Sequence, residues 1–212
     1  MQRSSLNLYV VDDDEAVRRS LLLMLMSTGF AVQGFESGEA FLDAVDMRRS
    51  GVLVLDLRLG GLSGLEVFAR LKATHSPLVV LFLSGHGDIP TALNAVRRGA
   101  YDWVVKPDSE ALLAKLPGAL EEAAGRAEAL VLWESLTPRE REVAVHVARG
   151  TPNKEIARLL QPPCSPRSVE THRAHLFAKL GMSNDNVLGR WLERHAWLVD
   201  APLAADPMAG SP

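Results

Sequence analysis

The sequence predicts two units: a doubly wound α/β domain with a five-stranded parallel sheet, and a small all-α domain of four helices. Over residues 1–120, apolar runs of strand length alternate with amphipathic segments of helix length. The runs are apolar along almost their whole length, which is typical of a sheet covered on both faces. Over residues 136–200 we find no strand pattern, only short amphipathic segments separated by tight turns, as in a compact helical domain.

Five apolar runs are expected to form the strands of the sheet. In order they are Leu6–Val11, Ala31–Gly34, Val52–Leu55, Leu78–Leu83 and Tyr101–Val105. The helices expected between and after them are Glu15–Ser27, Gly38–Arg48, Leu65–Ala73, Ile89–Arg98 and a fifth that begins near Ser109. Strand and helix units repeated in this way place parallel strands side by side.

Capping residues mark the helices of the second half. Thr137-Pro138-Arg139-Glu140 is a capping box with proline at the first helical position, and its helix ends at Gly150. The other three helices are expected from about Asn153, from the cap Ser165-Pro166 to just before Gly181, and from about Asp185 to Leu198. Four short helices of this kind fit a single helical domain over residues 136–200.

The remaining segments are expected to be less regular. Pro117-Gly118 interrupts the helical pattern and an Ala/Glu-rich stretch follows, so residues 121–135 are expected to be a partly helical linker. Residues 201–212 are rich in Pro, Ala and Gly and are expected to form a disordered tail.

Composition excludes some classes of protein and suggests others. No segment approaches the roughly 20 apolar residues of a membrane span, and no apolar signal core precedes the first strand. The single cysteine, Cys164, cannot form an internal disulfide, which fits a cytoplasmic location. Residues 1–125 hold 12 Lys/Arg against 16 Asp/Glu, whereas residues 137–200 hold 10 against 7. This asymmetry, from −4 to +3, suggests a metal- or phosphate-binding half and a nucleic-acid-binding half.

Polar residues follow the expected strands at the points where these end. Asp12-Asp13 follows the first strand, Asp56 the third, Ser84 the fourth and Lys106-Pro107 the fifth. The carboxyl ends of parallel strands share one edge of a sheet, and ligands bind there. Any one of these motifs alone favours a simpler interpretation, as a helix cap, a turn or the end of a strand. Together they predict a site for a divalent metal and a phosphoryl group.

Each side chain of this edge has a separate chemical task in that interpretation. Asp56 is the candidate nucleophile, because a carboxylate can accept a phosphoryl group as an acyl phosphate. Asp12 and Asp13 offer oxygen ligands for Mg²⁺. Lys106 can pair with one phosphoryl oxygen as a point charge, and the Ser84 hydroxyl can bind another.

This pattern resembles the flavodoxin-like receiver domain of two-component response regulators. The matching segments are Val10–Glu15, Leu55–Arg58, Ser63-Gly64, Ser84–Asp88 and Lys106-Pro107, which together span residues 6–120. The resemblance implies that a sensor histidine kinase phosphorylates Asp56. It implies Mg²⁺ ligands from Asp13, Asp56 and the Arg58 backbone carbonyl, with Asp12 acting through water. It also implies that Ser84 and Trp103 occupy switch positions and that the Lys106-Pro107 peptide is cis.

Three residues depart from the pattern of that family. Gly60 stands where proline is common, Trp103 replaces Phe or Tyr, and Asp108 stands where Phe is frequent. None of these changes removes a group that the phosphoryl chemistry needs, so they bear on switching and on the lifetime of the phosphoryl group.

The second half resembles the LuxR-type helix-turn-helix domain. The matching segments are Leu136–Val143, Asn153–Ala157, Ser168–Arg173 and Lys179–Gly181. The two resemblances together describe transcriptional response regulators of the FixJ/NarL class. They imply promoter DNA as a partner and a homodimer on activation.

The third helix of this domain is expected to be the recognition helix. Its apolar residues Val169, Leu176 and Leu180 face inward, which leaves the opposite face for DNA. Basic side chains would hold phosphates, Glu170 could accept from cytosine, and Thr171 could touch a thymine methyl. The full set of expected contact residues is Lys154, Arg167, Glu170, Thr171, Arg173, Ala174 and Lys179.

The turn before this helix is about two residues longer than the family usually has. It consists of Gln161-Pro162-Pro163-Cys164, and its two prolines limit the conformations available to it. Cys164 with His172 and His175 is a weaker alternative as a zinc site, because their spacing fits no common set of zinc ligands.

Two other functions remain open from the sequence. The first is a Mg²⁺-dependent phosphohydrolase that uses Asp56, although such enzymes usually carry a second acid where Arg58 stands. The second is a receiver whose helical domain binds a protein rather than DNA. The favoured interpretation is a cytoplasmic, non-enzymatic regulator of transcription that phosphorylation switches.

Overall fold

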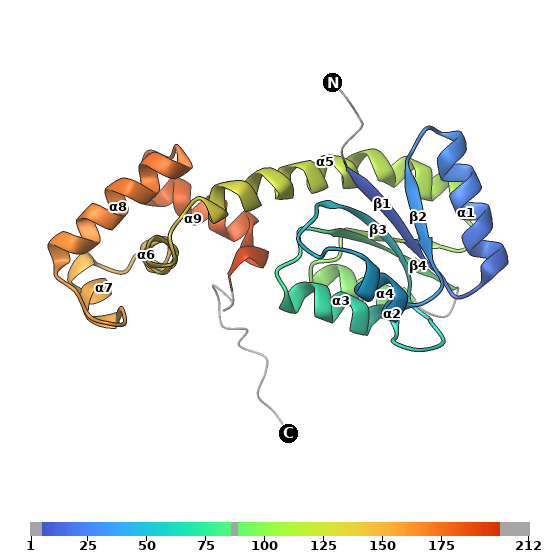
Figure 1. The fold of residues 1–212 in the computed structure, drawn as a ribbon, viewed down its shortest axis with the longest axis horizontal. Helices are drawn as coiled ribbons and strands as arrows, with labels where there is room; N and C mark the ends of the chain where they lie inside the picture. The colour runs from blue at the N-terminus through green and yellow to red at the C-terminus, as the bar shows by residue number, and fades with distance from the viewer. Residues whose placement is uncertain (1–5, 86–88, 200–212) are drawn as a thin grey trace. The chain divides into compact units, whose positions relative to one another are not determined.

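The computed structural model describes residues 6–85 and 89–199, and it divides the chain into two compact units, residues 1–127 and 128–212 (Figure 1). The expected tail, residues 201–212, lies outside the described residues, as does the segment His86–Asp88 of the receiver pattern. Among the described residues, no helix has the length and apolar character needed to cross a bilayer.

A five-stranded parallel sheet forms the centre of the first unit, which confirms the predicted fold class. The strands lie in the order β2-β1-β3-β4-β5. Their bounds are β1 Asn7–Val11, β2 Val32–Phe35, β3 Gly51–Asp56, β4 Val79–Ser84 and β5 Asp102–Val105. Each boundary lies within one residue of its expected position. Strands β1, β3 and β4 are buried along nearly their whole length, and such continuous apolar runs mark strands clearly in the sequence.

Helices cover both faces of the sheet (Figure 1). Their bounds are α1 Glu15–Ser27, α2 Gly38–Ala44, α3 Gly64–Ala73, α4 Ile89–Arg97 and α5 Ser109–Glu134. One core contains Phe41 of α2 and Phe68 of α3, and the other contains Leu25 of α1 and Leu112 of α5. Alternate strand residues point into these two cores, so the sheet is buried on both sides.

Helix α2 is shorter than the sequence predicts. It ends at Ala44 rather than Arg48, because Val45 has an extended backbone with φ −103° and ψ 130°. Asp46 then begins a turn in which its carboxylate accepts a hydrogen bond from Arg48 N at 3.0 Å. Local bonding by the aspartate thus competes with continuation of the helix.

Among residues 135–199 of the second unit, four α-helices and a 3₁₀ turn follow the end of α5. They are α6 Pro138–Ala148, α7 Asn153–Leu159, α8 Pro166–Leu180, α9 Asp185–Arg194 and η1 Ala196–Leu198. The predicted capping box is present, since Thr137 and Glu140 each bond to the other's backbone N–H. Ser165 caps α8, and Gly181 ends it with φ +65°, a conformation that favours glycine. The last helix is interrupted at His195, where α9 gives way to the 3₁₀ turn.

Helix α5 is one continuous helix, in contrast to the expected break at Pro117-Gly118 and partly helical linker. Its last turns belong to the second unit, where Ala129 and Trp133 are buried in the core. Arg141 donates from Nε to Trp133 O at 3.0 Å and from Nη2 to Glu134 O at 3.2 Å, so it caps the end of α5. The folded helical unit therefore includes residues before the capping box.

A fragment that begins at residue 128 is expected to unfold at a higher temperature than one that begins at residue 136. The shorter fragment lacks the buried Trp133 side chain, and loss of a buried tryptophan side chain alone costs about 3–5 kcal/mol. Circular dichroism melts of both fragments check this, with Val131→Ala in the longer one as a control at a 69% exposed position. Equal unfolding temperatures for the two fragments would contradict it.

Candidate functional site

The polar residues predicted to share the sheet edge do lie together. Asp12 follows β1, Asp56 ends β3, Ser84 ends β4 and Lys106 follows β5. The Lys106 Nζ lies 2.7 Å from Asp12 Oδ2 and 2.6 Å from Asp56 Oδ2. Asp12 is completely buried and Asp56 nearly so. One ammonium thus bridges carboxylates that come from two different strands.

Three carboxylates converge at this edge. Asp12, Asp13 and Asp56 each offer an oxygen, and these oxygens lie within 4.8 Å of one another. Asp13 is exposed, and a Cβ on Gly60 would lie only 3.5 Å from Asp13 Oδ2, so the loop after Asp56 passes close to it. Three negative charges against one ammonium leave an excess of negative charge. This oxygen-rich donor set suits a hard divalent cation such as Mg²⁺.

Burial and ion pairing shift the pKa values of the central pair. Burial raises the pKa of Asp56, and it outweighs the lowering effects of the Lys106 ammonium and of the Arg58 N–H at 3.2 Å. Burial alone would lower the pKa of Lys106, but its interactions with the Asp12 and Asp56 carboxylates outweigh it and raise that pKa. The ammonium is therefore held in its charged form, whereas the Asp56 carboxylate is destabilised.

Two residues that the sequence did not single out hold the acidic loops in place. Arg18 of α1 donates from Nη1 to the Asp12 carbonyl at 2.6 Å. Glu39 of α2 accepts at Oε1 from Leu62 N at 2.8 Å, in the loop that follows Asp56. Both contacts end on backbone atoms, which leave no mark in the sequence. They restrain the loops after β1 and β3 on either side of the carboxylates.

The predicted switch residues lie on adjacent strands. Ser84 is completely buried at the end of β4, and its Oγ has no hydrogen-bond partner among the described residues. Trp103 on β5 is half-buried and packs against the core that contains Phe68 and Phe82. The register pairs Trp103 with Phe82, two residues before Ser84. Ser84 and the Trp103 indole are therefore close to each other in the sheet.

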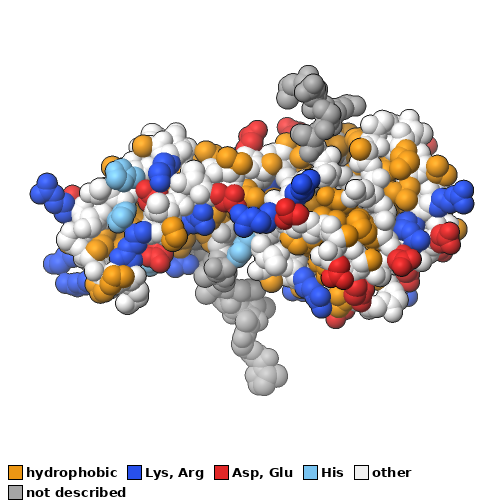
Figure 2. Space-filling view, in the orientation of Figure 1, with side chains coloured by type: hydrophobic (Ala, Val, Ile, Leu, Met, Phe, Trp, Pro, Cys, Tyr) orange, Lys and Arg blue, Asp and Glu red, His pale blue; other side chains and the backbone are white. Residues whose placement is uncertain are grey.

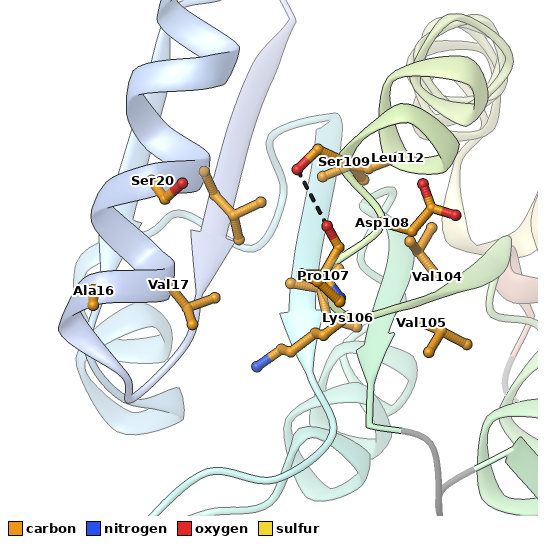
Figure 3. A pocket seen from close by; sticks show the side chains of 12 residues that line it. Ala16, Val17, Ser20, Val104, Val105, Lys106, Pro107, Asp108, Ser109 and Leu112 are labelled. Carbon is orange, nitrogen blue, oxygen red and sulfur yellow. Dashed lines mark hydrogen bonds between the residues drawn. The ribbon is translucent and has the colours of Figure 1, made fainter.

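The loop after Lys106 has the cis peptide that the resemblance implied, and a cavity that was not predicted lies beside it. The Lys106-Pro107 peptide is cis, and Lys106 N donates to Ser84 O at 2.8 Å. Asp108 accepts from Ala111 N at 2.8 Å, so its carboxylate bonds to the first turn of α5. A cavity of about 320 Å³ lies between α1 and this loop (Figure 3). Its walls include Val17 and Leu112, and the Lys106 side chain lies along it.

The helical unit presents most of the predicted DNA-contacting residues on its surface. Lys154 at the start of α7 is exposed, and so are Arg167, Glu170, Thr171 and Ala174 on α8. On the opposite side of α8, Val169, Leu176 and Leu180 are buried in the core, as the periodicity predicted. Figure 2 shows many Lys and Arg side chains on the surface of this unit. Exposed polar and basic side chains near the N-terminus of α8 suit contact with a DNA groove.

Two of the predicted contact residues form ion pairs inside the unit. Arg173 Nη2 lies 2.5 Å from Asp185 Oδ1, and Lys179 Nζ lies 2.6 Å from Glu140 Oε2. Burial would raise the pKa of Glu140, but hydrogen bonds from Lys179 and Thr137 outweigh it and lower that pKa. Arg173 and Lys179 thus already help to hold α8 against its neighbours, and a DNA phosphate would have to compete with these ion pairs.

The geometry does not support the alternative zinc site. Among residues 6–85 and 89–199, the one group of three potential ligands close enough to share an ion is Asp12, Asp13 and Asp56. His175 instead has Nδ1 3.9 Å from Glu140 Oε1. Cys164, His172 and His175 therefore do not form a metal centre.

Comparison with known proteins agrees with both halves of this geometry. Residues 8–117 match the response regulator receiver domain, and residues 134–192 match bacterial regulatory proteins of the luxR family. The chain is a two-component response regulator. Its receiver domain carries the carboxylate edge, and its LuxR-type domain is the DNA-binding domain.

Similar proteins match this chain over nearly its whole length. The transcriptional regulatory protein FixJ of Bradyrhizobium diazoefficiens is 39% identical over 202 residues, covering 92% of this chain and 98% of FixJ. The tetrathionate response regulatory protein TtrR of Salmonella typhimurium is 37% identical, covering 89% of this chain and 93% of TtrR. The crystal structure of full-length FixJ from B. japonicum superposes with a TM-score of 0.55 at 37% identity, covering 92% of this chain and 98% of FixJ. These relatives confirm the predicted FixJ/NarL class of transcriptional regulators.

The Asp56→Asn response regulator is expected to be more stable than the wild type at pH 7 without added metal. Because the folded-state pKa of Asp56 is raised, its ionised form destabilises the fold above that pKa and has no such effect below the unfolded pKa. The variant's unfolding temperature should exceed that of the wild type by a few degrees at pH 7, and the difference should shrink as the pH falls toward 4.

The control for this experiment is Asp43→Asn, which removes the same charge from an exposed position on α2. Thermal unfolding of all three proteins across this pH range makes the comparison. If Asp56→Asn is less stable than the wild type at pH 7, the assigned direction of the pKa shift is wrong.

Proposed function

We propose that this response regulator accepts a phosphoryl group on Asp56 from a sensor histidine kinase and thereby controls promoter binding by α8. The observation that carries the proposal is the Lys106 ammonium, which lies within 2.7 Å of both Asp12 and Asp56 at an edge with a third carboxylate. Access to promoter DNA also calls for a cytoplasmic location.

The side chains of the edge have separate roles in the transfer. A carboxylate oxygen of Asp56 forms a bond to phosphorus while the bond from phosphorus to the histidine nitrogen of the kinase breaks, and the electron pair stays on that nitrogen. Asp13, Asp56 and the Arg58 carbonyl would hold Mg²⁺, with Asp12 acting through water. When bound, Mg²⁺ supplies positive charge between the carboxylates and the phosphoryl oxygens. Lys106 moves its ammonium from the Asp56 oxygen to a phosphoryl oxygen.

The buried Ser84 hydroxyl supports a switching role at the same edge. Its Oγ has no other hydrogen-bond partner among the described residues, so it can donate to a phosphoryl oxygen. Movement of Ser84 toward the phosphoryl group would shift β4 and the neighbouring Trp103. The result is a shift of population between two states rather than turnover of substrate, so we propose no enzymatic activity.

The output of the switch is binding of promoter DNA as a homodimer. We place the protein contact on the α4 and β5 side of the receiver domain, next to the strand that carries Trp103; Leu93 of α4, 47% exposed, lies on that side. Two α8 helices in a dimer would lie about one turn of DNA apart. The exposed residues Arg167, Glu170 and Thr171 would meet base edges or phosphates, and Lys154 would hold the backbone.

Incubation with a small phosphodonor and Mg²⁺ is expected to add one phosphoryl group to the wild type and none to Asp56→Asn. Intact-mass spectrometry measures the addition, and size-exclusion chromatography measures the dimer. An equal gain of mass in Asp56→Asn would contradict the acceptor assignment.

A gel shift on promoter DNA over a range of salt tests the output in the same samples. Phosphorylated wild type is expected to bind more tightly than the unmodified protein, with affinity that falls steeply as salt rises. No shift at low salt, with the acyl phosphate present, would favour a protein partner for the helical domain instead.

A further inference from the structure

We propose that Arg139 is a positioning residue for DNA recognition: its guanidinium holds the turn between α7 and α8 and so fixes the direction of α8. This inference rests on the proposed DNA-binding function of α8. It concerns the segment Gln161–Cys164, the turn that is longer than the family pattern.

The turn has few hydrogen-bond donors of its own. Pro162 and Pro163 lack backbone N–H groups, so these two residues offer only carbonyl acceptors. The N–H of Cys164 is already used, because it donates to Ala157 O at 2.9 Å. The carbonyls at the start of the turn therefore need a donor from another element if they are to be held by the protein.

Arg139 supplies that donor from the first turn of α6. It donates from Nη1 to Gln161 O at 3.2 Å and from Nη2 to Pro162 O. The same Nη1 also lies 2.9 Å from Glu142 Oε2, and the Arg139 side chain is only 22% exposed. A guanidinium is a planar fork that can reach two adjacent carbonyls at once, whereas a lysine ammonium is a point donor on a flexible stem.

The contact connects α8 to a fixed part of the domain. Helix α6 is anchored in the core by Val143, Ala144 and Val147, all of which are buried. Ser165, the N-cap of α8, comes immediately after the turn that Arg139 holds, and the helix begins at Pro166. The residues proposed to meet DNA lie in the first two turns of α8, so a change in the path of the turn displaces them directly.

Two simpler roles for Arg139 make different predictions. If its contact with Glu142 were all that mattered, removal of Glu142 would have the same effect as removal of Arg139. If Arg139 contacted a DNA phosphate itself, its loss would lower the slope of log affinity against log salt by about 1 without changing the preference between sequences.

The first measurement uses Cys164, the only cysteine of the chain, which lies half-buried in the turn. Full-length wild type, Arg139→Lys, Arg139→Gln and the control Glu142→Gln are treated with a chromogenic thiol reagent under native conditions. Both Arg139 variants should react several-fold faster than the wild type, and Glu142→Gln should react at the wild-type rate. Cooperative thermal unfolding shows that each variant is folded. Equal rates in the wild type and in a folded Arg139 variant would overturn the proposal.

The second measurement compares two DNA duplexes, one selected by the wild type from a random library and its scrambled counterpart. Arg139→Lys should lose about tenfold of the preference for the selected duplex, the scale of one good base contact, with an unchanged salt slope. An unchanged preference would overturn the proposal, as would a lowered salt slope. If the wild type selects no duplex, the proposed DNA-binding function itself fails. If the wild type selects a duplex and Arg139→Lys prefers it to the same extent, only the inference about Arg139 fails.

Discussion

The burial of Asp12 and Asp56 around the single Lys106 ammonium is the constraint that organises the carboxylate edge of the receiver domain. The two ion pairs join the ends of β5, β1 and β3, strands that are not all neighbours in the sheet. They also offset part of the cost of burying Asp12, whose carboxylate would otherwise be a charge without compensation in the interior. The edge still carries an excess of negative charge, and this excess suits it to a divalent cation, without which the carboxylates would repel a phosphoryl group.

A buried carboxylate also organises the helical domain. Glu140 caps α6 by accepting from Thr137 N at 2.8 Å, and it pairs with Lys179 near the end of α8. Arg139 and Arg141, its neighbours on either side, reach the α7–α8 turn and the end of α5. The first turn of α6 thus connects α5 and α8, the helix that comes from the receiver domain and the helix proposed to read DNA.

Much of the fold and the centre of the site could be predicted from the sequence, because both depend on patterns that buried strands impose. The boundaries of α1 follow from its amphipathic pattern, and the convergence of Asp12, Asp56 and Lys106 follows from strand length and parallel topology. The continuity of α5 was missed because Pro117 breaks helices in general but is accommodated here. Arg18 and Glu39 were missed because their partners are backbone atoms. The ion pair of Arg173 was missed because the sequence does not distinguish an arginine that is ion-paired within the domain from one that is available to contact DNA.

Stabilisation of the receiver domain by Mg²⁺ tests the central claim most directly. Asp13 is exposed and is not part of the Lys106 ion pairs described above, so Asp13→Asn should remove a metal ligand with little effect on the metal-free fold. We would titrate Mg²⁺ and follow thermal unfolding at each concentration. The wild type and the exposed control Asp43→Asn should gain the same stability. That gain should grow with the logarithm of one plus the ratio of the Mg²⁺ concentration to its dissociation constant. Asp13→Asn should need at least about ten times more Mg²⁺ for the same gain, on the scale of losing a charged ligand. An equal response of Asp13→Asn and the wild type would contradict the account.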